Sequence, residues 1–368
     1  MAITRIGNPA IADVREPNFR NIIINGDMSI AQRGTSATTL ALSSTGFRYN
    51  DVDRFCVNAG NVSSGQVSTQ QIDSGLDGFP KAKRITVTTA QASPATNGYL
   101  SIAQGVEAQN LQYLKYGTSN ALALTLSFYV RSSVTGNYTG NIIQSDNSAR
   151  VFVFNFTINS ANTWEKKTIS ILADASGLIN NDNGQGFEIN FAYLYLGSGY
   201  NNGTLNTWNT NSGADEYSNS ATRVNLLATS GATFDITGVQ LEAGQVASDF
   251  EFLPVDVNLQ RCQRYYQKIQ DIINARLGAM AIVSGTSAYV SLPIGSTMRS
   301  TPTISDSGDL QINDDAVNAI ITSYSNIKLS GTIFAFAGTA SGGGLTQRTP
   351  GTLRFPSSSS YLEINAEL

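Results

Sequence analysis

Alternating hydrophobic and polar positions dominate the middle of the chain. In residues 121–130 (from Leu122 onward), 150–159 and 187–195, every second residue is large and hydrophobic. Each run is bounded by residues typical of turns, mainly Gly, Asn and Ser. Short strands at this spacing predict an antiparallel β-sandwich or jelly roll. Because the hydrophobic rows are one-sided, each sheet is expected to pack one face on a core and leave the other in water.

A later run, residues 232–242 (ATFDITGVQLE), alternates with one irregularity. The pattern slips by one residue at Thr237-Gly238, and a slip at a glycine is what a β-bulge produces. We interpret this run as the last long strand of the first domain.

The period then changes. Residues 258–269 (NLQRCQRYYQKI) carry hydrophobic side chains three and four positions apart, which predicts a helix, with Asp256 or Asn258 as its N-cap. From about residue 279 a weaker alternation returns and predicts a second, smaller β-sandwich. Residues 1–20 lack periodicity and are expected to form an attachment arm. The predicted domains are therefore the arm 1–20, a jelly roll 21–253, a helical linker 254–278 and a small β domain 279–368.

The amino-acid composition excludes several kinds of functional site. The chain has 368 residues, of which 14% are charged, and it contains no histidine; about 25% charged residues is usual for soluble domains. The absence of histidine excludes Ser-His-Asp and Cys-His catalytic sites and histidine-ligated zinc. A net charge of −4 argues against nucleic-acid binding. No hydrophobic stretch approaches the length needed to span a membrane, so we expect no membrane insertion.

The two cysteines, Cys56 and Cys262, are far apart in sequence. The sequence does not decide whether a disulfide joins them. Two cysteines form neither a disulfide framework nor an all-cysteine zinc site. The simpler interpretation is that both are small buried side chains, in a protein made in a reducing cytosol.

Several motifs follow one another in a recognisable order. They are residues 21–33 (NIIINGDMSIAQR), 53–55 (DRF), 125–132 (TLSFYVRS), 164–165 (WE), 237–244 (TGVQLEAG), 250–251 (FE), 259–268 (LQRCQRYYQK), 298–303 (MRSTPT) and 365–368 (NAEL). This series resembles the carbohydrate-binding-module-like jelly roll of bacteriophage tail fibres and related virion surface proteins.

The resemblance implies a non-enzymatic virion structural protein, usually a homotrimer, assembled in the cytoplasm of the bacterial host. One expectation is a tail fibre or fibre tip with host-surface glycan adhesion. The alternative is a capsid decoration protein attached to the major capsid protein through residues 1–20. No coiled-coil heptads occur, which favours a compact knob, clasp or head-decoration role, or a fibre tip attached through another protein, over a long shaft.

Glycan cleavage would need a pair of carboxylates. The candidates Asp182, Glu188, Asp215 and Glu216 show no pairing in the sequence, and turn formation by Asp and solvation of Glu explain them more simply. We therefore expect no enzyme.

Glycan binding has a better candidate. The segment 197–217 (GSGYNNGTLNTWNTNSGADEY) places Tyr200, Trp208 and Tyr217 among amide and hydroxyl side chains. Aromatic faces stack on the C–H faces of sugars while amides bond hydroxyl groups. Tyr and Trp also anchor subunit contacts, so both interpretations stay open.

No cofactor is expected. A structural calcium at Asp27 and Glu242, with Asp51 and Asp53 as alternatives, would suit oxygen ligands. We favour the simpler interpretation, in which Asp27 caps a turn and Glu242 pairs with a basic residue.

Overall fold

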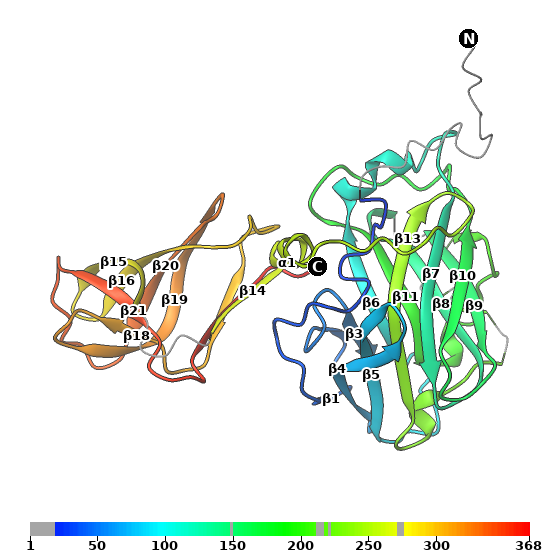
Figure 1. Cartoon of the computed structure of the whole chain (residues 1–368), viewed down its shortest axis with the longest axis horizontal. Helices are drawn as coiled ribbons and strands as arrows, with labels where there is room; N and C mark the ends of the chain where they lie inside the picture. Colours follow the sequence, from blue (N-terminus) through cyan, green and yellow to red (C-terminus); the bar gives the residue numbers. More distant parts are fainter. Residues whose placement is uncertain (1–18, 148–149, 211–216, 220–221, 271–275) are drawn as a thin grey trace, which may run out of the picture.

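The computed structural model describes residues 19–147, 150–210, 217–219, 222–270 and 276–368. Figure 1 shows a large β lobe and a smaller one, joined through the helix α1 (Val255–Gln263) and the strand β14 (Tyr266–Gln270). The predicted all-β fold, a jelly-roll sandwich followed by a linking helix and a smaller β domain, is confirmed. The predicted attachment arm 1–20 lies almost wholly outside the described residues.

The large lobe consists of two antiparallel sheets. The six-stranded sheet has the order β1 (Thr38–Ala41), β4 (Gln66–Leu76), β5 (Phe79–Thr89), β13 (Thr233–Ala243), β7 (Leu124–Ser132), β10 (Glu165–Ile171). The seven-stranded sheet has the order β12 (Trp208–Thr210), β9 (Arg150–Ile158), β8 (Gly136–Gln144), β11 (Gln185–Leu196), β6 (Tyr99–Glu107), β3 (Cys56–Gly60), β2 (Gly46–Arg48). Short 3₁₀ turns lie at η1 (Ala108–Leu114), η2 (Ser145–Asn147), η3 (Ser198–Tyr200) and η4 (Leu226–Ala228).

The three alternating runs form β7, β9 and β11, as predicted, and their hydrophobic rows meet in one core between the sheets. Two details differ. Leu122 precedes β7 and is exposed. Tyr193 is absent from that core because a register shift between Asn190 and Tyr193 in the β11–β8 pairing moves its side chain to the outer face. There it bonds Asn141.

The predicted bulge in residues 232–242 is confirmed. The pairing of β13 with β7 shifts between Thr237 and Gln240, and Gly238 has a φ of 59°. A β-carbon at Gly238 would approach the rings of Phe79 and Tyr129, so glycine satisfies both the left-handed backbone and the close packing.

The predicted helix 258–269 is wrong in its extent. Helix α1 starts at Val255 with Pro254 as N-cap, so neither Asp256 nor Asn258 caps it. It ends at Gln263, and the residues from Tyr266 onward form β14, which pairs antiparallel with β22 (Tyr361–Asn365). This pairing with a strand almost 100 residues away along the chain is a tertiary contact that overrides the local helical period.

The smaller lobe contains a closed six-stranded barrel and a three-stranded sheet, a more specific arrangement than the predicted sandwich. The barrel has the order β15 (Arg276–Ser284), β16 (Ser287–Pro293), β20 (Ile333–Ala340), β19 (Asn318–Ser330), β18 (Gln311–Asn313), β21 (Pro350–Arg354). The small sheet has the order β14, β22, β17 (Thr303–Asp306), and both parts share one hydrophobic core.

Charged and aromatic side chains join the two lobes. Glu367, just after β22, pairs with Arg54 and lies 3.2 Å from Arg33 of the jelly roll. Arg264, at the end of α1, binds both carboxylate oxygens of Glu107 at 2.6 and 2.7 Å. The guanidinium of Arg54 lies 3.5 Å from the ring centroid of Tyr265. The motif residues of the linker and of residues 365–368 therefore form the contact between the lobes.

Candidate functional site

The structure brings two of the three predicted site residues together. Tyr200, in η3, and Tyr217 stack with their ring centroids 5.6 Å apart and an interplanar angle of 7°. Tyr99, at the start of β6, meets Tyr200 edge-on at 6.2 Å. All three rings are half-buried. We call Tyr99, Tyr200 and Tyr217 the tyrosine row.

Trp208 does not belong to this row. Its ring contacts Tyr116, Phe152 and Phe187, at centroid distances of 5.8, 5.5 and 6.5 Å. Its indole N–H donates to the backbone oxygen of Leu172 at 2.7 Å. The ring thus covers the edge of the core, because β12 pairs with β9 in a register that places Trp208 opposite Phe152. The structure therefore does not bring Trp208 together with Tyr200 and Tyr217, because its half-buried ring packs on the core.

A network of polar side chains lies on the outer face of the seven-stranded sheet. Its members come from β3, β6, β8 and β11: Asn58, Ser101, Asn141, Glu188 and Asn190. Apart from Glu188, which is partly exposed, all of them are buried. Buried amides require hydrogen-bond partners, and here they supply partners for one another.

The hydrogen bonds run across the strands. The Glu188 carboxylate accepts from Asn58 at 3.0 Å and from Asn190 at 2.9 Å. The Asn190 amide also donates to Asn141 at 2.9 Å and accepts from the Ser101 hydroxyl at 2.6 Å. Asn141 in turn donates to the backbone oxygen of Tyr217 at 3.1 Å, which connects the network to the tyrosine row.

Glu188 is therefore embedded in amides rather than solvated, which corrects the expectation from sequence. Burial raises the pKa of Glu188 above its ordinary value, although the bonds from Asn190 and Asn58 lower it in part. Asp182 accepts from the backbone N–H of Gly184 at 2.8 Å, so the predicted turn role is confirmed. Asp215 and Glu216 lie outside the described residues.

One arginine holds the segment that carries the tyrosine row. Arg223 donates to the backbone oxygens of Leu196 and Gly197, both at 3.0 Å, and to the side chains of Asn201 and Ser218 at 2.7 and 2.9 Å. These bonds connect both ends of the described segment to the end of β11. The position of Tyr200 and Tyr217 over the sheet is therefore held by Arg223 together with the backbone bond from Ser218 to Tyr200 at 2.8 Å.

The carboxylates considered for calcium have protein partners. Asp27 accepts from the backbone N–H and hydroxyl of Ser29, as a turn cap does, and Glu242 lies 3.6 Å from Arg20. Asp51 pairs with Lys83, and Asp53 accepts from the backbone and side chain of Gln32. Among the residues that the structure describes, no group of three or more Cys, Asp or Glu side chains is arranged to hold a metal ion.

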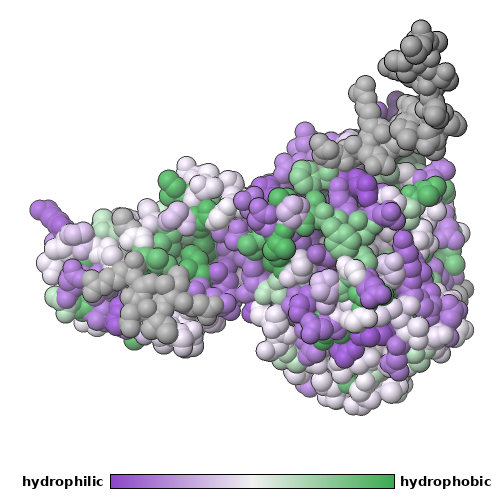
Figure 2. All heavy atoms as spheres, viewed as in Figure 1, coloured by the Kyte–Doolittle hydropathy of each residue, from purple (hydrophilic) through white to green (hydrophobic). Residues whose placement is uncertain are grey.

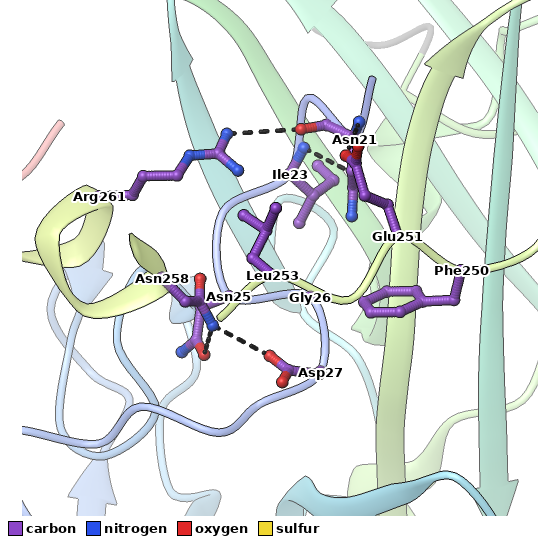
Figure 3. A pocket seen from close by; sticks show the side chains of 10 residues that line it. All are labelled: Asn21, Ile23, Asn25, Gly26, Asp27, Phe250, Glu251, Leu253, Asn258 and Arg261. Carbon is purple, nitrogen blue, oxygen red and sulfur yellow. Dashed lines mark hydrogen bonds between the residues drawn. The ribbon is translucent and has the colours of Figure 1, made fainter. Parts of the chain in front are cut away.

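The most specific sequence motifs meet beside α1, away from the tyrosine row. Asn25 and Asp27 bond Asn258 of α1, at 3.4 and 3.2 Å, and the Glu251 carboxylate accepts from the backbone N–H of Asn21 at 2.9 Å (Figure 3). The pocket among them has a volume of about 10 Å³, which is room for one water molecule at most. These motif residues therefore serve to hold the first segment, the linker and α1 together.

Both cysteines are buried free thiols, which confirms the interpretation of both as small buried side chains. Cys56 lies in β3, where its thiol contacts the backbone oxygen of Ala103 at 3.2 Å. Cys262 packs with Ile24, Ile30 and Tyr265. Burial raises the pKa of both thiols, which keeps them in the unreactive protonated form.

Comparison with known proteins adds structural neighbours only. No known protein family matches the chain, and no curated protein matches its sequence. A putative sugar-binding protein from Bacteroides thetaiotaomicron matches 61% of this chain and 100% of its own length, at 13% identity and a TM-score of 0.33. A family 11 carbohydrate-binding module from Clostridium thermocellum, in complex with a mixed-linked tetrasaccharide, matches 58% and 99%, at 12% identity and a TM-score of 0.29.

The enzymatically active domain of the bacteriophage CBA120 tailspike protein 4 matches 61% of this chain but only 22% of its own length, at 11% identity and a TM-score of 0.29. Identities and TM-scores this low transfer no property of these proteins to the chain. Within the described residues, no helix is long and apolar enough to cross a membrane. Figure 2 shows mostly hydrophilic or neutral residues on the face in view, with hydrophobic residues in small groups.

Proposed function

We propose that this chain is a non-enzymatic glycan-binding protein whose site is the outer face of the seven-stranded sheet. The observation that carries the proposal is the tyrosine row lying beside a bonded amide–carboxylate network. Tyrosine rings offer faces on which sugar C–H groups stack, and the phenol ends offer hydrogen bonds. The network fixes the sheet beneath these rings, so little order has to be gained when a sugar binds.

The resemblance of the motif series to virion surface proteins extends this proposal to a role in attachment of a virus to its host cell. We infer a virion component, at a tail fibre or fibre tip, that contacts glycans of the host surface. In a homotrimer, three weak sites act together and raise the overall affinity without new contacts.

The surroundings of Glu188 support a binding role over cleavage. Its hydrogen-bond partners among the described residues are the amides of Asn58, Gln185 and Asn190, whereas a glycosidase requires a second carboxylate at a defined separation. A single carboxylate held by amides is suited to accept hydrogen bonds from sugar hydroxyls. A polysaccharide-release assay tests this: release of reducing ends by the full chain would contradict a purely binding function.

Binding is tested with Tyr200→Ala and Tyr217→Ala on a glycan array and in a host-cell adsorption assay. Each variant should lose most of the binding of the wild type. Tyr289→Ala is the matched control, because Tyr289 is 51% exposed on the barrel, away from the tyrosine row. Unchanged binding by both row variants would refute the proposed site.

The tyrosine row could instead form a contact between subunits, and a separate measurement tests this. Sedimentation of the same two variants reports their oligomeric state. If both variants dissociate while binding per subunit is retained, the row is an interface and the glycan site is elsewhere. Imaging of the intact particle by electron microscopy tests the virion location.

A further inference from the structure

A second, larger cavity lies where the jelly roll meets α1. It has a volume of about 520 Å³ and is lined by the segment 19–24, by η1, and by Arg261 of α1 with Arg264 and Tyr265 just after it. None of the residues of the tyrosine row or of the network lines it. A volume of this size falls within the usual range for small-molecule sites, about 300–1,000 Å³.

Two arginines line this cavity, Arg261 and Arg264, and they differ in their bonding. Arg264 is bonded to Glu107 through both carboxylate oxygens, and Arg20 lies 3.6 Å from Glu242. Arg261 has no carboxylate within ion-pair distance among the described residues. Its guanidinium donates to the backbone oxygen of Asn21 at 3.4 Å, toward which it extends from α1 in Figure 3.

The burial of this guanidinium is compensated only in part, by the bond to Asn21 and by the ring of Phe19, whose centroid lies 6.0 Å away. Burial lowers the pKa of Arg261, and the nearby Cys262, Tyr265 and Glu251 offset this only in part. A planar guanidinium with donors to spare matches the two oxygens of a carboxylate. The cavity is therefore built to receive negative charge.

The remaining lining suits a hydroxylated ring. Asn110 and Tyr113 of η1 are exposed at the rim, and neither side chain has a hydrogen-bond partner among the described residues. Ile22 and Ile24 form an apolar wall. An amide, a phenol and an aromatic face next to one cation are the groups that bind sugar hydroxyls and sugar C–H faces.

We propose that this cavity binds a carboxylate-bearing sugar of the hexuronate class, with its carboxylate on Arg261 and its ring against Tyr113. The inference does not rest on the proposed glycan site, since the two sites share no residue. It adds a preference for acidic glycans, which the tyrosine row does not supply because Tyr99 lies near the Glu188 carboxylate.

The test is isothermal titration calorimetry of the full chain with two matched probes. Methyl β-D-glucuronide and methyl β-D-glucoside differ only at the carboxylate. The glucuronide should bind about tenfold tighter or more, since a hydrogen-bonded charge contributes at least that factor. Equal binding of the two probes would overturn the proposal.

Variants separate the roles of the lining. Arg261→Gln should abolish the preference for the glucuronide, whereas Arg348→Gln, an exposed arginine on the barrel lobe, should keep it. Tyr113→Ala should weaken both probes by a similar factor, roughly two- to tenfold. A preference that survives Arg261→Gln contradicts the assignment of the carboxylate.

Two controls keep the result interpretable. Thermal melting of Arg261→Gln checks that it folds; if it does not, Arg261→Lys, which keeps the charge but loses the bidentate geometry, should reduce the preference instead. N-acetylglycine represents a peptide carboxylate. If it binds as tightly as the glucuronide, the cavity is a peptide site and the sugar assignment is overturned.

Discussion

Removing one carboxylate at the junction should destabilise the jelly roll strongly. Arg54 is fully buried, Glu367 is 6% exposed, and the two form an ion pair. Arg33 also pairs with Glu367, at 3.2 Å. Arg54 also donates to the backbone oxygen of Gly105 at 2.6 Å and lies over Tyr265. Glu367→Gln keeps the shape of the side chain and removes its charge. The Arg54 guanidinium is then buried without a counter-charge.

The magnitude follows from the desolvation of that cation. Breaking a buried ion pair by removing one partner costs about 3–5 kcal/mol of the free energy of unfolding. Two contacts of Arg54, with Gly105 and Tyr265, remain, so we expect a loss near the lower end, about 3 kcal/mol. Removing the charge of both partners leaves no buried cation without a counter-charge. Arg54→Leu combined with Glu367→Gln should therefore be more stable than Glu367→Gln alone.

Urea unfolding followed by tryptophan fluorescence measures this loss of stability in the jelly roll. Both tryptophans of the chain, Trp164 and Trp208, belong to the jelly roll. Asp73→Asn is the control, because its ion pair with Lys81 is exposed, with 87% of the Asp73 side chain in solvent. That variant should change stability by less than about 1 kcal/mol. A loss below about 1 kcal/mol for Glu367→Gln, or a double variant no more stable, would refute the reasoning.

Three further variants test other parts of the structure. Trp208→Ala should lower the free energy of unfolding by about 3 kcal/mol, because it opens the edge of the core; a melting temperature equal to that of the wild type would contradict this packing. Gly26→Ala places a β-carbon 2.0 Å from the Val239 backbone oxygen and should cost about 2 kcal/mol or more in urea unfolding, whereas Gly285→Ala, which has space, serves as the tolerated control. Burial raises the pKa of Asp53 to about 6, so the folded protein binds more protons than the unfolded chain between about pH 4 and pH 6, and this group's contribution to stability falls as pH rises. The free energy of unfolding of Asp53→Asn, measured relative to the wild type in urea, should therefore rise by on the order of 2 kcal/mol from pH 4 to pH 7. A difference between variant and wild type that does not change with pH would argue against this reasoning.

Part of the candidate site was within reach of the sequence. The segment 197–217 pointed to Tyr200 and Tyr217 because aromatic residues among amides are a local feature. Glu188 and Asn190 also occupy the polar positions of a predicted strand, so their place on the outer face follows from the period of two. The hydrogen-bond partners of these two residues could not be predicted from the period. The hydrogen bond from Asn58 to Glu188 joins residues 130 positions apart, and only the strand order β3, β6, β11, β8 brings them within reach of each other across β6.

Trp208 and the end of α1 show the same limit. Local composition made Trp208 look like a residue of an exposed polar loop, yet its pairing opposite Phe152 turns the ring onto the core. Local periodicity continued the helix through Ile269, yet the pairing of Tyr266–Gln270 with β22 makes a strand. In both cases hydrogen bonds and buried area supplied by a distant segment outweigh a local preference.

By itself the sequence determined the all-β class, the strands of the core, the bulge at Thr237-Gly238 and the absence of histidine chemistry, because periodicity and composition are properties of neighbouring residues. The tertiary structure decided which polar side chains form the network, that Trp208 faces inward, and that Arg261 lines a cavity without a carboxylate partner among the described residues. Those outcomes depend on strand order and on the packing of the two lobes, which bring together residues that no local pattern connects.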